Sequence, residues 1–82
     1  MTNWILYIIE CHDRSLYTGI TTDLEKRIKR HNQGRATKYT RARRPVKLVH
    51  SEIVNSESLA RKREAEIKSL SRQDKIKLIK KH

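Results

Sequence analysis

The segment WILYIIEC at residues 4–11, followed by LYTGI at residues 16–20, decides how this chain folds. The first segment is rich in β-branched and aromatic residues and is apolar on both alternating faces, which predicts a strand covered on both sides. The polar residues 12–15 predict a turn, after which the second segment returns as a second strand. The chain therefore begins with a β-hairpin.

A helix and then a third strand are expected after this hairpin. Residues Thr22-Asp23-Leu24-Glu25 have the pattern of a capping box, with Thr22 as the N-cap. Gly34 is expected to end the helix, and residues 35–45 to form a polar, basic loop. Residues 46–54 are then expected to form the third strand.

Two more helices are predicted at the end of the chain. Asn55 or Ser56 is expected to cap a long helix that reaches about Leu70, and Ser71 to cap a last helix. Two isoleucines are expected on the buried side of that last helix, Ile76 and Ile79. The order β-β-α-β-α-α predicts an α+β fold with a small, three-stranded, mainly antiparallel sheet flanked by helices. At 82 residues, one domain over residues 1–82 is expected.

The charge is strongly positive and unevenly placed. The formal net charge is +11, and no acidic residue occurs from Lys26 to Ser51. This predicts a polyanionic partner, with DNA favoured, while a solvated surface, a membrane surface or an acidic protein are the alternatives. Tyr39 in this run is a candidate to stack on an unpaired base. The candidate nucleic-acid contacts are Arg35, Lys38, Tyr39, Arg41, Arg43, Arg44 and Lys47.

Several classes of protein are excluded or disfavoured. The single Cys11 excludes an internal disulfide and a cysteine-based zinc site. The apolar stretch at residues 4–9 is too short to span a membrane, so no membrane partner is expected. No signal peptide is visible, and a cytoplasmic location is therefore expected. The other histidines have no partners at metal-ligand spacing and are expected to be structural or exposed: His12, His50 and His82.

Four residues near the N-terminus are candidates for one site: Tyr7, Tyr17, Arg27 and His31. Arg27 and His31 are four residues apart and therefore share one face of the predicted helix. Tyr7 and Tyr17 can serve the same site only if they point from the same face of the sheet. We therefore predict an odd-length hairpin loop or a bulge, with Tyr17 opposite Cys11.

A later carboxylate would complete a site for metal-dependent cleavage of phosphodiester bonds. The predicted helix after Ser56 has a buried stripe formed by Leu59, Ala60, Ile67 and Leu70. Glu64 and Glu66 lie on opposite shoulders of this stripe, so periodicity leaves both open. Arg63 lies near its middle, which indicates that the stripe borders a polar cleft.

The order of these motifs resembles the GIY-YIG nuclease superfamily, and most closely its small, stand-alone bacterial members. The resemblance covers nearly the whole chain. It rests on Ile5-Leu6-Tyr7, Tyr17-Thr18-Gly19, Arg27, His31 and the run Ala60–Glu64. The chain departs from the family pattern in three ways. The first triplet keeps only its tyrosine, Ile20 replaces a common lysine, and the downstream asparagine of several active members has no counterpart.

The resemblance implies a catalytic role for Tyr7, Tyr17, Arg27, His31 and Glu64. It selects Glu64 as the ligand of one divalent cation, Mg²⁺ or Mn²⁺. Tyr7 is then expected to act as the general base, with its pKa lowered by Arg27 or the metal. Tyr17 would orient water or phosphate, Arg27 would bind phosphate oxygens, and His31 would relay a proton or contact the leaving group.

The expected function is a metal-dependent DNA endonuclease or exonuclease, either structure-selective or directed by a partner protein. Taken singly, each tyrosine is expected more often as a strand aromatic, and the arginine and histidine as ordinary contact or packing residues. A non-catalytic DNA- or RNA-binding module is therefore the main alternative. A small protein that docks an acidic partner through its basic face is the third.

Overall fold

The computed structural model describes residues 3–81, and His82 lies outside this range. Its elements are β1 (Trp4–Glu10), β2 (Leu16–Thr21), α1 (Leu24–Asn32), α2 (Lys38–Arg41), β3 (Lys47–Val54), α3 (Glu57–Lys68) and α4 (Arg72–Lys80). The strands form one antiparallel sheet in the order β2-β1-β3. The predicted α+β fold and its order of strands and long helices are confirmed, with the short α2 as an addition.

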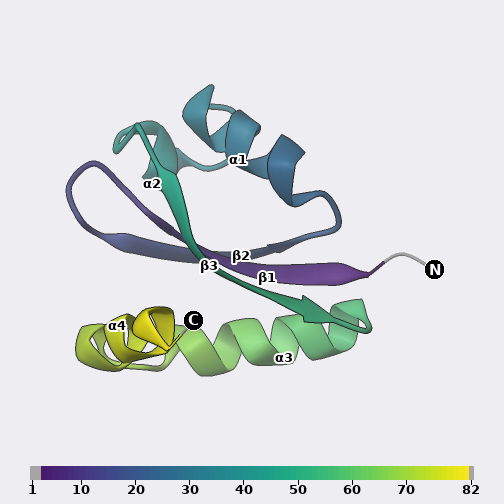
Figure 1. The fold of residues 1–82 in the computed structure, drawn as a ribbon. Coiled ribbons are helices and arrows are strands. Elements are labelled where there is room, and N and C mark those ends of the chain that lie inside the picture. The colour runs from purple at the N-terminus through teal and green to yellow at the C-terminus, as the bar shows by residue number, and fades with distance from the viewer. Residues whose placement is uncertain (1–2, 82) are drawn as a thin grey trace.

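Helices cover both faces of the sheet, as predicted for β1 (Figure 1). On one face, Tyr7 and Ile9 are buried against α1, together with Cys11 and Val46. On the other face, alternate residues of β1 meet α3 and α4, among them Leu6. The central strand is therefore buried on both sides because its neighbours in sequence point to opposite helical layers.

The hairpin between β1 and β2 places both tyrosines on one face, as predicted. The loop has an odd length, residues 11–15, and Tyr17 is paired with Ile9. The predicted pairing of Tyr17 with Cys11 was wrong. Cys11 turns into the loop, where its N–H donates to the carbonyl of Ser15 at 2.8 Å, and the strands pair only from Glu10 onward. The observed loop is longer than the predicted one and shifts the strand register by two residues. A shift of two residues keeps each side chain on the same face of the sheet.

The first helix begins one residue later than the capping box predicted. Asp23, not Thr22, is the N-cap, and its side chain accepts from the N–H of Lys26 at 3.1 Å. Asp23 is itself held by Thr21, the last residue of β2, whose hydroxyl accepts from the Asp23 N–H at 3.2 Å. Because aspartate caps a helix at least as well as threonine, this neighbour of the predicted cap takes its place.

The expected loop at residues 35–45 contains the short helix α2. Thr37 is its N-cap and accepts from the N–H of Thr40 at 3.2 Å. The segment that follows α2 is held by Asn32 of α1, whose Oδ1 accepts from the Val46 N–H at 2.7 Å. A helix of one turn has too few residues for an apolar period, so the sequence pattern did not predict it.

The last two helices follow the prediction closely. Of the two candidate caps for α3, Ser56 is the one used, and Ser71 caps α4 as expected. Helix α3 ends at Lys68 rather than near Leu70. Ala60 and Ile67 are buried, but Leu59 is 49% exposed, so its expected place in the buried stripe was wrong. Within residues 3–81, no helix is both long and apolar enough to cross a membrane.

Candidate active site

Tyr7 lies at the centre of the site, on the middle strand of the sheet. Its side chain is 2% exposed and points toward α1, where its hydroxyl is 2.8 Å from Nε2 of His31. Gly19 is its partner on β2, and a Cβ atom there would lie 2.5 Å from the Tyr7 hydroxyl. The glycine is therefore required because the tyrosine ring occupies the space that any other side chain would need.

His31 connects this tyrosine to α2. The ring is fully buried, and its Nδ1 is 2.8 Å from Oγ1 of Thr40. Thr40 is also fully buried, and its Oγ1 is 2.9 Å from the hydroxyl of Thr37. Sequence reasoning missed both threonines as members of the site. The cap-like spacing of Thr37 and Thr40 was the only signal, and it did not reveal their contact with His31.

Tyr17 also packs against the ring of His31. The two rings meet edge to face with centroids 5.5 Å apart, and the other side of Tyr17 is stacked on Tyr39 at 6.0 Å. The guanidinium of Arg43 lies 3.9 Å from the centroid of the Tyr39 ring and also pairs with Asp13. Tyr39 thus contacts two other side chains and is still 38% exposed. That it stacks on an unpaired base stays a prediction.

Burial keeps Tyr7 and His31 in their neutral forms. Desolvation raises the pKa of Tyr7 to about 12, although the charge of Arg27 lowers it. The expected lowering by Arg27 is present, but the cost of burying a phenolate exceeds the attraction of the arginine. Desolvation, together with Arg27, lowers the pKa of His31 to about 4. The hydrogen bond between them therefore joins two uncharged groups at neutral pH.

Arg27 and Glu64 belong to α1 and α3, the helices that lie on opposite faces of the sheet (Figure 1). Both side chains are half-buried, and both charges act on the pKa of Tyr7. Glu66 is exposed, and its charge acts on Arg63 instead. Of the two carboxylates that periodicity left open, Glu64 is thus the half-buried one, and its charge raises the pKa of Tyr7.

Glu64 is the candidate metal ligand. Its side chain is 20% exposed, and its carboxylate pairs with Lys68 at 3.2 Å. Residues 3–81 contain no cluster of three or more His, Cys, Asp or Glu side chains that could hold an ion. Mg²⁺ keeps several waters and is often bound by one or two carboxylates plus phosphate oxygens, so a single glutamate is compatible with it.

Arg63, which lies near the middle of the apolar stripe of α3, has polar partners on the sheet. Its guanidinium forms two hydrogen bonds to Glu52 on β3, at 2.8 and 3.0 Å. The same carboxylate is 2.8 Å from Nε2 of the buried His50. These contacts, led by the hydrogen bond from Arg63, lower the pKa of Glu52 to about 2. Arg63 is therefore accommodated by an ion pair between α3 and the sheet.

The candidate nucleic-acid contacts lie in different settings. Arg35, Lys38 and Arg41 line a pocket of about 380 Å³ beside α2. Arg43 is paired with Asp13 at 3.1 Å, and Arg44 donates to the carbonyl of Arg41 at 3.0 Å. Sequence reasoning missed a second basic hollow, of about 370 Å³. Its cationic residues are Lys26, Arg30 and the candidate catalytic residue Arg27.

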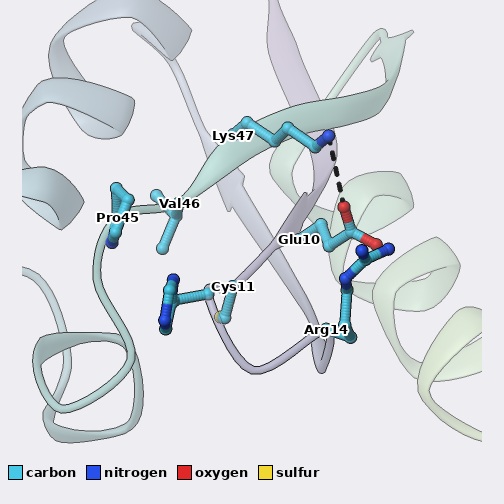
Figure 2. Close-up of a pocket in the computed structure, with 7 residues that line it drawn as sticks. Glu10, Cys11, Arg14, Pro45, Val46 and Lys47 are labelled. Carbon is cyan, nitrogen blue, oxygen red and sulfur yellow. Dashed lines mark ion pairs between the residues drawn. The ribbon is translucent and has the colours of Figure 1, made fainter.

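Lys47 lies at a separate pocket of about 280 Å³, where the β1–β2 loop meets the start of β3 (Figure 2). Its ammonium group is 3.4 Å from the carboxylate of Glu10, while the lysine side chain stays 73% exposed. The pocket is lined on its other sides by Cys11, Pro45 and neighbouring residues. None of the five candidate catalytic residues lines it, so it is distinct from the site around Tyr7.

The chain is similar to known proteins along most of its length. Residues 3–77 match the GIY-YIG catalytic domain. The UPF0213 protein of Staphylococcus saprophyticus is 54% identical over 79 residues, which are 96% of each chain. The UPF0213 protein of Haloquadratum walsbyi is 55% identical over 73 residues, which are 89% of this chain and 82% of that one.

Two solved structures are similar as well, both determined by solution NMR. The UPF0213 protein of Bacillus halodurans has 46% identity and a TM-score of 0.62, with 95% of this chain and 83% of that chain covered. A protein of E. faecalis has 37% identity and a TM-score of 0.67, with 99% and 86% covered. Together with the matched motifs around Tyr7, these similarities show that the chain belongs to the GIY-YIG catalytic domain family.

Proposed function

We propose that this protein is a metal-dependent nuclease that hydrolyses phosphodiester bonds in DNA at the site around Tyr7. The observation that carries the proposal is the buried hydrogen bond between Tyr7 and His31, at 2.8 Å. The charges of Arg27 and Glu64 both act on the pKa of the same tyrosine. A proton carrier, a phosphate-binding cation and a metal-binding carboxylate are the groups that this reaction requires.

Tyr7 and His31 act together on the attacking water. Because the pKa of Tyr7 is raised to about 12, a free phenolate is not the base. The phenol instead takes a proton from the water as it passes its own proton to Nε2 of His31. The water oxygen forms the new bond to phosphorus, and the bond to the leaving oxygen breaks. The negative charge of a bound phosphate favours the protonated histidine that results.

Arg27 supplies the second requirement, a fixed positive charge. A guanidinium stays protonated at any working pH and can hold two phosphate oxygens at once. Arg27 lines the basic hollow that also contains Lys26 and Arg30, so a phosphate placed there would meet several cations. The reaction increases negative charge on the phosphoryl oxygens, and these cations would stabilise that charge.

Glu64 would hold the divalent cation, Mg²⁺ or Mn²⁺. When bound, such an ion polarises a phosphate oxygen and stabilises the departing oxygen. The ammonium group of Lys68 pairs with the carboxylate of Glu64 at 3.2 Å. Lys68 lies one turn further along α3, and its side chain is exposed. Metal binding at this position therefore requires Lys68 to release Glu64, which a flexible surface lysine does at little cost.

The substrate contacts would continue onto α2 and the loops beside it. The exposed cations Arg35, Lys38 and Arg41 extend the basic surface from α1. Contacts of this kind bind the phosphate backbone without reading sequence. Selectivity for a DNA structure, or a partner protein, would then direct cleavage.

The test is cleavage of labelled single-stranded, duplex and branched DNA, and of RNA, with Mg²⁺, with Mn²⁺ and with neither. The wild type is compared with Glu64→Gln and with Glu66→Gln, which removes an equal charge from the same helix at an exposed position. We expect metal-dependent cleavage by the wild type and by Glu66→Gln, and its loss in Glu64→Gln.

Two results would contradict the proposal. Wild-type protein that binds DNA in a salt-sensitive way but never cleaves it would support the non-catalytic binding module instead. Cleavage that survives Glu64→Gln would assign the metal to another carboxylate or the activity to a contaminant.

A further inference from the structure

We infer that Thr40 is a positioning residue, which holds His31 in the tautomer with hydrogen on Nδ1, so that Nε2 is free to accept the proton of Tyr7. The inference rests on the proposed function for its consequence in catalysis. Its structural part stands on the hydrogen bonds of the Tyr7 and Thr40 hydroxyls to His31.

The Thr40 hydroxyl has three polar neighbours. It lies 2.8 Å from Nδ1 of His31, 2.9 Å from the hydroxyl of Thr37 and 3.4 Å from the carbonyl oxygen of Thr37. A hydroxyl has one hydrogen to donate and two lone pairs that accept. Three partners can therefore be satisfied together only if one of them accepts and the other two donate.

The buried hydroxyl of Tyr7 decides which partner accepts. Within residues 3–81, Nε2 of His31 is the one hydrogen-bond partner of this hydroxyl, so the phenol hydrogen has no other acceptor there. Nε2 therefore accepts, and the single hydrogen of the neutral ring lies on Nδ1. Thr40 then accepts from Nδ1 of His31, and its own hydrogen is directed to the hydroxyl or the carbonyl of Thr37.

The tautomer of His31 follows from this arrangement. A neutral imidazole carries one hydrogen, and with that hydrogen on Nδ1 the other nitrogen has a lone pair. That nitrogen is Nε2, which is 2.8 Å from the Tyr7 hydroxyl, so the phenol donates. The opposite tautomer would reverse this bond, and the histidine would then be unable to take a proton from Tyr7.

Burial gives the threonine its effect. Thr40 and His31 are both fully buried, so water cannot replace a lost partner of the ring. Helix α2 is too short to pack by itself, and the Thr37 cap orients Thr40 toward α1. Helix α2 thus places the hydroxyl of Thr40 next to the ring of His31.

The test combines Thr40→Val, which keeps the shape and removes the hydroxyl, with Thr40→Ser, which keeps the hydroxyl. Long-range ¹H–¹⁵N correlation spectra report the tautomer of each histidine, and a His31→Gln sample assigns the signals of His31. We expect the Nδ1–H form in the wild type and in Thr40→Ser. In Thr40→Val we expect the Nε2–H form or a mixture.

Cleavage kinetics provide the second measurement. We expect Thr40→Val to lower kcat by about tenfold or more with little change in KM, and Thr40→Ser to stay within about threefold of the wild type. An Nε2–H histidine in the wild type would overturn the inference, and that measurement needs no variant to fold. A Thr40→Val protein with the wild-type tautomer and kcat would overturn it as well. If the wild type does not cleave DNA, the proposed function fails, while the spectra still decide the role of Thr40.

Discussion

Within residues 3–81, two histidines are buried, and they lie on opposite faces of the sheet. His31 is fully buried on the side of α1, and His50 is 4% exposed on β3, on the side of α3. His31 contacts two hydroxyls, those of Tyr7 and Thr40. The ring of His50 instead contacts the carboxylate of Glu52, which two hydrogen bonds join to Arg63.

The comparison shows that both the burial of a histidine and its partners determine what it can do. Desolvation keeps His31 uncharged, and its hydroxyl partners leave it a lone pair that can receive a proton. The network of His50 contains a carboxylate whose pKa is lowered to about 2, so its charge is fixed at any working pH. We therefore assign His31 to the reaction and His50 to the packing of β3 against α3.

The strongest way to break this comparison is to replace each histidine by glutamine and measure cleavage per folded molecule. Glutamine can accept a hydrogen bond but cannot carry a proton. We expect His31→Gln to lose activity by about 100- to 1,000-fold, as is typical for removing a general acid–base group. His50→Gln is expected to stay within about threefold of the wild type. Equal losses in the two variants would remove the distinction between them.

The pH dependence of stability separates the two sites next. The pKa of His31 is about 4 when folded and 6.5 when unfolded, so below 6.5 only the unfolded chain gains this proton. The contribution of His31 to the free energy of unfolding is thus complete above pH 6.5 and is lost as the pH falls to about 4. At about 1.4 kcal/mol for each pH unit, the loss approaches roughly 3 kcal/mol.

Urea unfolding of the wild type and of His31→Gln at pH 7, 5.5 and 4 measures this loss. The variant is expected to show a shallower decrease over the same range. The contribution of Glu52 falls outside most of this window, because its pKa of about 2 lies below the ordinary 4.5 and its stabilisation is lost only as the pH falls through that interval. The same slope in both proteins would contradict the assignment of the proton to His31.

The ion pair beside His50 gives the smallest expected effect, and it concerns stability alone. Glu52→Gln removes the charge that holds both Arg63 and His50, at a position where the glutamate side chain is only 24% exposed. We expect a destabilisation of about 1–3 kcal/mol. The control is Glu57→Gln, which breaks an exposed pair with Arg61 and is expected to cost less than about 0.5 kcal/mol.

Chemical denaturation measures both variants, and cleavage per folded molecule is expected to be unchanged in each. A loss of activity in Glu52→Gln beyond its loss of folded protein would connect the network on β3 to the reaction.

Local patterns in the sequence predicted much of this molecule. The structure confirms three predictions that used short-range properties: the strand within residues 4–11 with two apolar faces, the serine caps of α3 and α4, and the two tyrosines on one face. The family motifs likewise selected residues from α1 and β2 that meet in space. Such features depend on neighbours in sequence, so they can be recognised without knowing the fold.

The tertiary structure alone decided the chemistry of the site. The pKa of Tyr7 rises rather than falls because burial by distant residues exceeds the influence of Arg27. Arg63, which the stripe on α3 left unexplained, is matched by Glu52 eleven residues earlier on another element. Thr40 reaches His31 only because α2 folds back on α1. The sequence by itself determined which elements form and which reactive groups they carry, while long-range packing decided their partners, their protonation and their direction.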